Sequence, residues 1–286
     1  MIGPRIAVVG AGPVGRALAL GYRAGGGDVV AVVSRSGTAA RELARSCGAE
    51  TGSSDLSDVL GAGVVIIAVP DRALEELGAR IAAIAFARPM LLLHTSGACD
   101  GAVLGCGAHA MGSLHPLQSF PASAGDADLV ARVAGSHWFH EGAGASDCAE
   151  MVAVWRGTLH RLAPGGKSLY HAGAAVLSNH TVALFDAAAR LFEAAGVGPA
   201  ESREPLSALL AGTVANLERL GVPAALTGPI ARGDVATIRR HLDAIRSAAP
   251  ELSESYAAMA RRTLVVARAK GSIAPEAAAE IERLLG

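Results

Sequence analysis

The sequence lacks the features that mark nucleic-acid-binding, membrane-spanning or secreted proteins. Its formal net charge is -1 and no basic stretch alternates with aromatic residues, so nucleic acid is not an expected partner. No apolar run reaches the roughly 18 residues that a membrane helix needs, because "GVVIIAVP" ends at Pro70 and Asp71. The first predicted strand begins almost at Met1, which leaves no room for a signal peptide. We therefore expect a soluble, cytoplasmic protein without a membrane partner.

Cysteine and lysine are both scarce. The chain has four cysteines, which are Cys47, Cys99, Cys106 and Cys148. Neither their spacing nor their distance to His109 and His115 fits a CxxC or HxxxH template, so we predict buried thiols and no metal site. Only two of the 25 basic residues are lysines, Lys167 and Lys270. This bias makes each lysine a candidate for a specific role.

The first half of the chain alternates short apolar runs with helical segments. Four runs rich in Val, Ile and Leu are predicted to be buried strands, at residues 5–10, 28–34, 64–70 and 89–97. Helices are predicted between them at about 13–24, 37–47 and 72–86, followed by shorter strands at 111–120 and 135–142. Strands that alternate with helices of this length are typical of a doubly wound, mostly parallel α/β sheet.

The pattern changes after "APGG" (163–166). From Lys167 to about residue 195 no proline interrupts a dense scatter of Ala, Leu and Val, which predicts one helix about 40 Å long. Further helices are predicted at about 202–220, 234–248, 250–270 and 275–285, each bounded by Pro or Gly. The expected organisation is an α/β nucleotide-binding domain over residues 1–162 and an all-helical domain over residues 163–286.

The stretch "VVGAGPVGRAL" places a G-x-G-x-x-G motif between the first strand and the first helix. Gly10 permits the tight turn, Gly12 lets a pyrophosphate approach the backbone, and Gly15 lets the helix pack close to the sheet. The motif alone is weak evidence in a chain with 35 glycines, but its position in the first βαβ unit supports it. The predicted dinucleotide contacts in this loop include Pro13 and Val14.

The position that usually binds the adenosine ribose carries no acid. An acidic residue about 20 residues past the glycines would hydrogen-bond the 2′-hydroxyl of NAD. This chain has Ser34, Arg35 and Ser36 there. A carboxylate would repel a 2′-phosphate, whereas an arginine fork and two hydroxyls suit one. We therefore predict NADP as the cofactor; the alternative is that Arg35 is only a solvated turn residue.

Further cofactor contacts are expected where two later strands end, because open α/β sheets bind ligands at the carboxyl ends of their strands. In "HTSGA" (94–98), Thr95 and Ser96 can offer hydroxyl and N–H groups to a nicotinamide amide or a substrate carboxylate. A capped strand-to-helix turn explains either residue equally well. The contacts predicted from these strand ends are Val69, Pro70, Asp71, His94, Thr95, Ser96 and Gly97.

Two segments offer candidate catalytic residues. In "LHPLQS", His115 precedes a proline that holds the chain extended, and Gln118 follows as a candidate substrate contact; His115 is equally well explained as a structural hydrogen-bonder. On the long predicted helix, Lys167 and His171 share one face with Ser178. Either Lys167 or His171 is a candidate proton donor, since an imidazole exchanges protons near neutral pH. The alternative for Lys167 is an exposed lysine in the first helical turn.

The loop "TGPIARGD" joins two predicted helices. Gly233 breaks the helix and Asp234 is a good N-cap for the helix that follows. Neither role explains Arg232, whose guanidinium is suited to binding a substrate carboxylate through two hydrogen bonds.

With these motifs, the chain resembles the 6-phosphogluconate dehydrogenase-like superfamily, which includes β-hydroxyacid dehydrogenases, ketopantoate reductases, prephenate dehydrogenases and pyrroline-5-carboxylate reductases. More closely, "HTSGA", "SLHPLQSF", "SN" (178–179) and "LTGPIARGD" are similar to a bacterial family of Rossmann-like reductases whose C-terminal half is a domain of unknown function. The resemblance implies a Rossmann domain, a helical domain and an NADP cofactor. Lys167 and Asn179 resemble the catalytic Lys and Asn of the β-hydroxyacid dehydrogenases, although their separation exceeds that family's Lys-x-x-x-Asn spacing.

The sequence thus predicts an NAD(P)-dependent oxidoreductase that reduces a small, carboxylate-bearing carbonyl compound of the 2-oxo acid, ketopantoate-like type. The alternatives are a reductase of cyclic imines of the pyrroline-5-carboxylate type and a non-catalytic NADP-binding sensor. The active site is expected in a cleft between the two domains, with Lys167, His171, Asn179 and His115 as catalytic residues. The segment "HAGAAVLSNHTVAL" is rich in Ala and Gly and permits close helix approach. In the folds that the chain resembles, such a helix lies at a two-fold interface, so the resemblance implies a homodimer.

Overall fold

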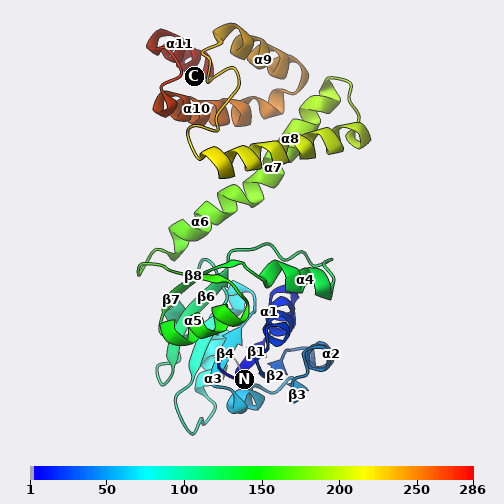
Figure 1. Ribbon diagram of the computed structural model, residues 1–286, viewed down its shortest axis with the longest axis vertical. Helices are drawn as coiled ribbons and strands as arrows, with labels where there is room; N and C mark the ends of the chain where they lie inside the picture. The colour runs from blue at the N-terminus through cyan, green and yellow to red at the C-terminus, as the bar shows by residue number, and fades with distance from the viewer. Residues whose placement is uncertain (1–2) are drawn as a thin grey trace. The chain divides into compact units, whose positions relative to one another are not determined.

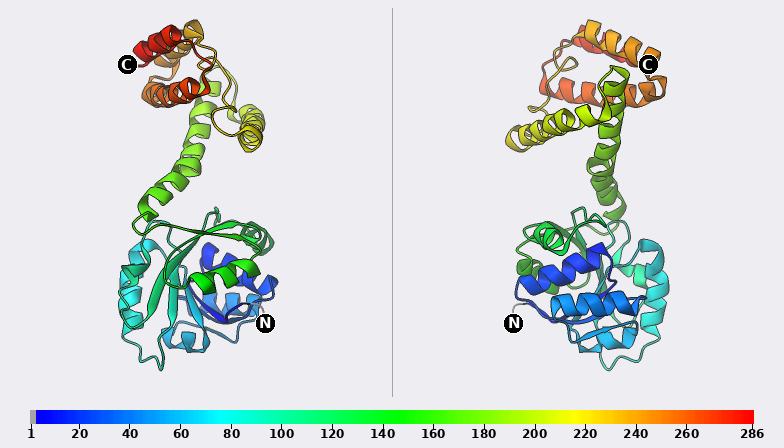
Figure 2. Two further views of the ribbon diagram at one scale, coloured as in Figure 1. Left: turned by 60° about the vertical axis from the view of Figure 1, so that its left-hand side comes forward. Right: turned by 90° about the vertical axis from the view of Figure 1, so that its right-hand side faces the viewer.

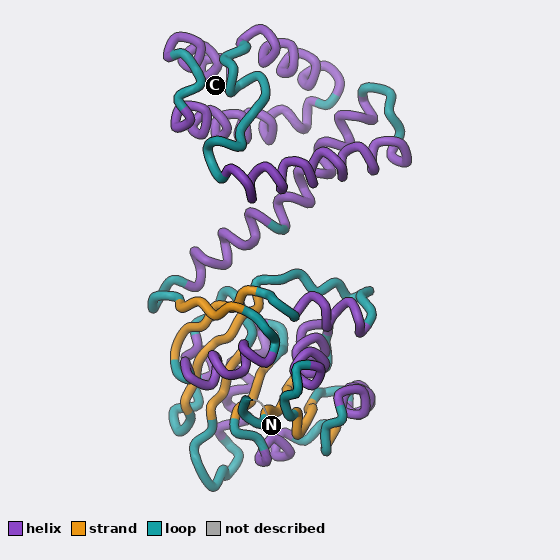
Figure 3. Tube along the Cα trace, in the orientation of Figure 1, coloured by secondary structure: helices purple, strands orange, loops and turns teal. Residues whose placement is uncertain are grey.

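The computed structural model describes residues 3–286. The chain divides into two compact units, of which the first ends at Ser178 and the second comprises Asn179–Gly286. Strands occur only in the first unit of the described chain, and the second unit is built of helices (Figure 3). The predicted fold class, a mostly parallel α/β domain followed by an all-α region, is therefore confirmed.

The first unit contains an eight-stranded sheet in the order β3-β2-β1-β4-β5-β6-β7-β8 (Figure 1). The strands are β1 (Ile6–Val9), β2 (Val29–Val33), β3 (Thr51–Ser53), β4 (Val64–Ile67), β5 (Leu91–His94), β6 (Ala110–Pro116), β7 (His137–Gly142) and β8 (Thr158–Arg161). All neighbouring strands pair in parallel except β6 and β7, which pair antiparallel. Strand β1 has β2 on one side and β4 on the other, so the strand order reverses there.

Helices cover both faces of this sheet (Figure 2). One face packs against α1 (Pro13–Ala24), α2 (Gly37–Cys47), α4 (Asp126–Val133) and α5 (Ala145–Val154). The other packs against α3 (Leu74–Ala82) and the short 3-10 helices at 56–61 and 101–104. Successive residues of β1 enter opposite cores, since Ile6 and Val8 belong to the first cluster and Ala7 and Val9 to the second. This alternation explains why the central parallel strands β1, β2 and β4 are apolar at every position.

The region predicted as one helix from Lys167 to residue 195 is two helices. They are α6 (Lys167–Leu177) and α7 (Asn179–Ala194), separated by a single turn residue, Ser178. Ser and Asn side chains compete for backbone hydrogen bonds and favour helix ends, so the sequence "SN" interrupts a pattern that is otherwise helical. The first compact unit therefore includes α6, while the functional boundary predicted after residue 162 stays a prediction.

The second unit continues with α8 (Pro199–Leu220), α9 (Val235–Ala248), α10 (Ser253–Lys270) and α11 (Pro275–Leu285). Its core is formed by apolar residues of α9, α10 and α11, such as Ile238, Leu264 and Ile281. Asp234 caps α9 by accepting a hydrogen bond from the backbone N–H of Thr237 (3.0 Å). Within residues 3–286 no helix is both long enough and apolar enough to cross a bilayer.

Candidate active site

The glycine-rich loop joins β1 to α1 at the point where the strand order reverses. Gly10 has a φ of 115°, and a Cβ there would collide with the carbonyl oxygen of Ala68 at the end of β4. A Cβ on Gly15 would collide with the carbonyl oxygen of Gly10. Gly12 is different, because no other described atom lies within 4 Å of a Cβ built on it. Two glycines thus let the loop pack against the sheet, and the third leaves the outer side of the loop open.

The N-terminus of α1 faces this open side. Pro13 occupies the first helical position and lacks an N–H, and no side chain in residues 3–286 caps the helix. The positive end of the helix dipole and the backbone N–H groups of the first turn are therefore available to an anion. This arrangement suits the pyrophosphate of a dinucleotide.

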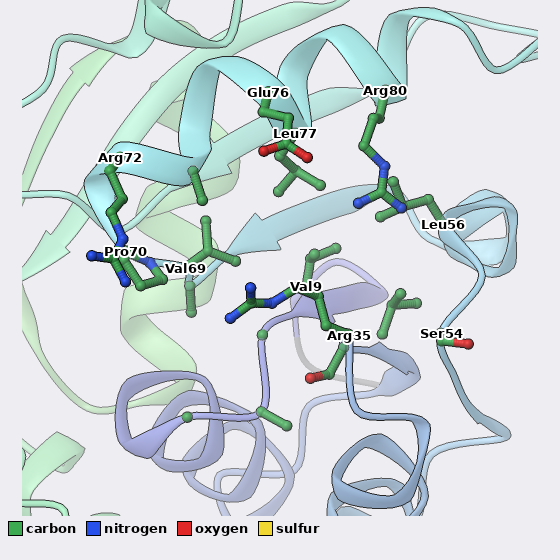
Figure 4. Close-up of a pocket in the computed structure, with 17 residues that line it drawn as sticks. Val9, Arg35, Ser54, Leu56, Val69, Pro70, Arg72, Glu76, Leu77 and Arg80 are labelled. Carbon is green, nitrogen blue, oxygen red and sulfur yellow. The ribbon is translucent and has the colours of Figure 1, made fainter.

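A pocket of about 320 Å³ lies between this loop and α3 (Figure 4). Its walls come from the ends of β1, β2 and β4 and from α3, and include Gly10, Gly12, Ser34, Arg35, Ser54, Leu56, Val69, Pro70, Arg72, Glu76, Leu77 and Arg80. Of the predicted cofactor contacts, six line it, whereas Pro13, Val14, Gly15, Ser36, Asp71 and the residues 94–97 do not.

Three arginines face this pocket. Arg35 lies on the wall formed by the end of β2, and Arg72 and Arg80 lie on the opposite wall (Figure 4). None of the three guanidinium groups has an ion-pair or hydrogen-bond partner within residues 3–286. Glu76 is the acidic residue of the lining, so the pocket is basic overall. Unpartnered guanidiniums are suited to phosphate groups, which they bind through paired N–H donors.

The residues beside Arg35 complete a candidate site for a 2′-phosphate. Ser36 caps α2 by accepting a hydrogen bond from the backbone N–H of Ala39 (3.3 Å), and its hydroxyl proton remains available. Arg41 donates to Thr38 Oγ1 (3.3 Å), which brings a second guanidinium to the first turn of α2. The open Gly12, the uncapped α1 terminus and these arginines fit a phosphorylated dinucleotide.

The turn after β5 is held by hydrogen bonds within the protein. The buried His94 donates from Nε2 to the carbonyl of Asp100 (3.0 Å) and accepts at Nδ1 from the backbone N–H of Ser96 (3.2 Å). Ser96 Oγ accepts from the N–H groups of Ala98 and Cys99 (3.1 and 3.0 Å). The N–H of Thr95 donates to the carbonyl of Ile67 (3.0 Å). The Thr95 hydroxyl also donates to the Ile67 carbonyl (3.4 Å). The backbone N–H groups of Thr95 and Ser96 and the Thr95 hydroxyl are therefore engaged in the fold, and only the hydroxyl proton of Ser96 is open to a ligand.

Two histidines lie directly against Gly97 in this turn. A Cβ on Gly97 would be 2.5 Å from His171 Nδ1 and 2.9 Å from His115 Nε2. The two imidazole rings meet edge to face, with 6.1 Å between their centroids. His115 Nδ1 forms a 2.7 Å hydrogen bond with the Tyr170 hydroxyl. Burial, together with the nearby charges of Lys167 and His171, lowers the pKa of His115 to about 4, so His115 is neutral at physiological pH.

Lys167 lies beneath the same turn. Its side chain is 1% exposed, and Nζ donates to the carbonyl oxygen of Ser96 (2.5 Å). No carboxylate of residues 3–286 pairs with it, although the charges of Glu141 and Asp100 act on it. Burial lowers the pKa of Lys167, and these acidic residues partly offset that effect. The interpretation of Lys167 as an exposed lysine is wrong, because the first turn of α6 packs onto the turn after β5.

The structure brings His115, Lys167 and His171 together at Gly97 within the first unit, but not the other candidates. Gln118 is exposed and contacts Ser119 and Arg132, and Ser178 is exposed at the end of the unit. Asn179 and Arg232 belong to the second unit, where both are exposed. Their predicted roles stay predictions.

Four residues of these sites were not predicted from the sequence: Arg72, Arg80, Tyr170 and Glu141. Arg72, Glu76 and Arg80 are spaced by four residues on the α3 side of the pocket, a helical stripe that could have been recognised. Glu141 accepts from the backbone N–H of Gly101 (2.7 Å), and Tyr170 bonds a residue 55 positions away. No local signal in the sequence indicates either of these contacts.

Two family models match separate parts of the chain. Residues 5–91 match the family model described as NADP oxidoreductase, coenzyme F420-dependent. Residues 141–263 match a domain of unknown function, DUF2520. No protein of curated function matches the chain. These matches confirm the predicted pairing of an NADP-type Rossmann domain with a C-terminal domain of unknown function.

Several solved structures share the fold over nearly the whole chain. A candidate NADP oxidoreductase of Bacteroides fragilis is 24% identical, with a TM-score of 0.71 over 91% of this chain and 98% of that one. A protein of Thermotoga maritima is 21% identical, with a TM-score of 0.74 over 93% and 99%. An imine reductase of Aspergillus terreus, in complex with NADPH4 and dibenz[c,e]azepine, is 17% identical, with a TM-score of 0.60 over 99% and 100%. At these identities the likeness shows a common fold.

Proposed function

We propose that this chain, an NADP-dependent oxidoreductase, reduces a small carbonyl compound that bears a carboxylate, of the 2-oxo acid class. NADPH, when bound, supplies the hydride that reduces the carbonyl carbon. The loop Gly10–Gly15 and the arginine-lined pocket would hold its phosphates and its adenosine. Residues at the end of β5 would then face the reacting carbon, as the carboxyl ends of strands do in open α/β sheets.

The observation that carries the proposal is the buried charge of Lys167 under the turn at Ser96 and Gly97. In its protonated form, Lys167 has no ion-pair partner in the described residues and attracts an anion bound near it, more strongly at low dielectric. Such an anion would offset the effect of burial, which lowers the pKa of Lys167. A substrate carboxylate is favoured there, and a positively charged iminium is disfavoured. A 2-oxo acid is therefore favoured over a cyclic iminium by the charge of the iminium, even where the imine bears a carboxylate.

The reduction also needs one proton, which the carbonyl oxygen takes up as the hydride reaches the carbon. Lys167 is enclosed and already donates to Ser96, whereas the exposed His171 places Nδ1 beside Gly97. We therefore assign His171 as the proton donor, which returns to its protonated form from solvent. Lys167 would act through its charge and through its bond to the turn. Asn179 and Arg232 remain candidate substrate contacts.

Reduction of a cyclic imine is the second candidate. It is favoured by the fold shared along 99% of this chain with the Aspergillus terreus imine reductase. A protonated iminium needs no acid from the enzyme, so that function would leave His171 without a proton-donating role. A sensor that binds NADP without turnover is the third possibility.

A substrate panel separates these functions. NADPH oxidation would be followed spectrophotometrically with 2-oxo acids, with the corresponding aldehydes and ketones that lack a carboxylate, and with cyclic imines. We expect sustained turnover with the 2-oxo acids and much less with the compounds without a carboxylate. Turnover restricted to imines would favour the second candidate. Tight NADPH binding without turnover of any compound would favour the sensor.

The proposed assembly is a homodimer through the helical unit. In the described chain α7 has no buried residue, and α8 exposes apolar side chains, among them Leu209 (67%), Val214 (46%) and Leu220 (45%). Apolar helix faces of this kind are typical of an interface between subunits. Light scattering at micromolar concentration should give the mass of two chains; the mass of one chain would contradict the proposal.

A further inference from the structure

The hydrogen bond between Tyr170 and His115 links the first turn of α6 to β6. It joins Tyr170 Oη and His115 Nδ1 over 2.7 Å, and the two rings meet edge to face with centroids 5.5 Å apart. His115 lies on β6 (Ala110–Pro116), and Tyr170 follows Lys167 by one helical turn. In the described residues each side chain has this one hydrogen-bond partner.

Aromatic contacts hold Tyr170 in the position that this bond requires. The ring of Phe139, on β7, lies 4.5 Å from that of Tyr170 between centroids. Phe139 in turn stacks on His160 of β8, with 4.8 Å between centroids and an interplanar angle of 20°. This column of rings extends from the edge strand to the active-site histidine. It restricts the Tyr170 side chain and aims its hydroxyl at His115.

The direction of the bond follows from the chemistry of the two groups. A neutral imidazole has one N–H donor and one basic nitrogen, and a phenol is the better donor while the imidazole nitrogen is the better acceptor. Burial keeps His115 neutral and raises the pKa of Tyr170, so the phenol keeps its proton. Tyr170 therefore donates and Nδ1 accepts. The single imidazole proton of His115 is then on Nε2.

Nε2 is the nitrogen that lies against Gly97, beside His171 Nδ1. No atom of residues 3–286 accepts a hydrogen bond from it. A neutral Nε2–H in this position can donate to a substrate oxygen but cannot accept a proton from a substrate nitrogen. The position of one proton on His115 therefore decides which kind of substrate the site can bind.

We propose that Tyr170 is a positioning residue that fixes the His115 proton on Nε2, so that His115 donates a hydrogen bond to the carbonyl oxygen of the substrate. The consequence for substrate choice rests on the proposed function, whereas the position of the proton does not. The Nε2–H stabilises the charge that develops on the oxygen as the carbon is reduced, while His171 supplies the proton. A protonated iminium has no acceptor for this hydrogen bond, so the same feature selects against it.

The tautomer can be measured directly by nuclear magnetic resonance. The NADP-bound enzyme would be labelled with ¹⁵N at its histidines, and the His115 signals would be assigned by their loss in H115Q. We expect a proton on Nε2 and none on Nδ1 in the wild type. In Y170F both nitrogen shifts should move, because the acceptor bond at Nδ1 is lost. A proton on Nδ1 in the wild type, or unmoved shifts in Y170F, would overturn the proposal.

The chain offers a matched control in its helical unit. Tyr256 Oη lies 2.9 Å from His241 Nδ1, and the rings meet edge to face as those of Tyr170 and His115 do. Y256F should move the His241 signals and leave those of His115, as well as the activity, unchanged. A change in the His115 signals in Y256F would mean that the shifts report a general disturbance, which would also count against the proposal.

A double-mutant cycle tests the effect on the reaction. Y170F should lower kcat ten- to a hundredfold and leave NADPH affinity within twofold of wild type. Glutamine at position 115 keeps an N–H donor near the Nε2 position and has no tautomers, so its donor does not depend on Tyr170. Adding Y170F to H115Q should therefore lower kcat by less than twofold. Equal losses in both backgrounds would overturn the positioning role. If no carbonyl compound is reduced but the tautomer is as expected, the proposed function fails and the role of Tyr170 stands.

Discussion

The two ends of the sheet edge formed by the carboxyl ends of β1, β2, β4 and β5 are built in opposite ways. At the end near β1 and β2, a pocket is lined by Arg35, Arg72 and Arg80. Their guanidinium groups have no partner in the described residues. At the end near β5 and β6, His94 and Lys167 are buried and bonded to the turn that follows β5. One end holds unpaired charge, and the other holds side chains whose positions are fixed by the fold.

The two ends of the edge suit two different proposed roles, cofactor binding and stabilisation of the transition state. A dinucleotide carries permanent negative charges, so affinity is gained by leaving guanidinium groups free to pair with them. A reacting carbonyl acquires charge only in the transition state, and stabilising it requires donors that are already in place. Substitutions at the first end should therefore change cofactor affinity, and substitutions at the second should change the rate.

The largest effect is expected for His171. H171Q removes the proposed proton donor and should lower kcat by about 10²- to 10⁴-fold, the usual contribution of a general acid. NADPH affinity should stay the same, because His171 does not line the arginine pocket. Steady-state kinetics and calorimetry on the same sample measure both. H180Q, at an exposed histidine on α7, is the control and should behave as wild type. A parallel loss of cofactor affinity in H171Q would break the division between the two ends.

The next effect is on stability in acid. The pKa of His115 is about 4 in the folded protein, below its usual value of 6.5. Between these values the unfolded chain binds more protons, so the stability of the folded state falls as the pH drops from 6.5 to 4. H115Q should remove this dependence. Between pH 6.5 and pH 4 its free energy of unfolding should fall by about 2 kcal/mol less than that of the wild type. Denaturant unfolding at pH 4, 5 and 7 provides the measurement. Identical pH profiles would show that His115 titrates normally.

A smaller effect is expected for cofactor choice. NADPH should bind at least about tenfold more tightly than NADH, a difference of about 1.4 kcal/mol. R35D should weaken NADPH far more than NADH, because the new carboxylate repels the 2′-phosphate. Calorimetry with both cofactors tests this. Equal affinity of the wild type for the two cofactors would contradict the assigned role of Arg35. The kcat of R35D at saturating NADPH should remain near that of wild type.

The smallest effect is expected for Arg80, across the pocket from Arg35. Because Arg80 lies across the pocket from Arg35, we expect its guanidinium to stack on the adenine ring of the cofactor. R80Q should then weaken NADPH binding two- to fivefold, or about 0.5–1 kcal/mol, which is typical of an exposed guanidinium near an aromatic ring. The 2′-phosphate is not required for this contact, so NADH should lose affinity in the same proportion. R88Q, at an exposed arginine outside the pocket, should leave both affinities unchanged. If R80Q affected NADPH alone, Arg80 would belong with Arg35 as a contact of the phosphate.

Local signals made much of the fold predictable. The bounds of α1 and α2 agree with the predicted 13–24 and 37–47, because Gly12 and Pro13 mark the start of one helix and Ser36 caps the other. The strands β3 and β8 were missed, since three or four residues such as "TGS" are too short for an alternating pattern. The helices α4 and α5 were missed as well, and the break at Ser178 was not foreseen.

The candidate sites divide in the same way. The glycine loop and Ser34–Ser36 have fixed spacing within one βαβ unit, so the cofactor end could be inferred from the sequence. Lys167 and His171 were found because they share a helical face. Their contacts with Ser96 and Gly97, and that of Tyr170 with His115, join segments 55 or more residues apart. Such contacts depend on how the sheet is ordered, which no single segment encodes.

Gly97 has a consequence for engineering this enzyme. Any side chain at this position would run into His171 and His115. A mutagenesis library aimed at new substrates should therefore keep residue 97 fixed, since a side chain there would displace the two imidazoles that the proposed reaction uses. Leu117 and Leu169, which are exposed and lie two residues along the chain from His115 and His171, are better places to introduce diversity. Gly97 thus restricts substitution through its packing against two histidines, although it has no proposed role in the reaction itself.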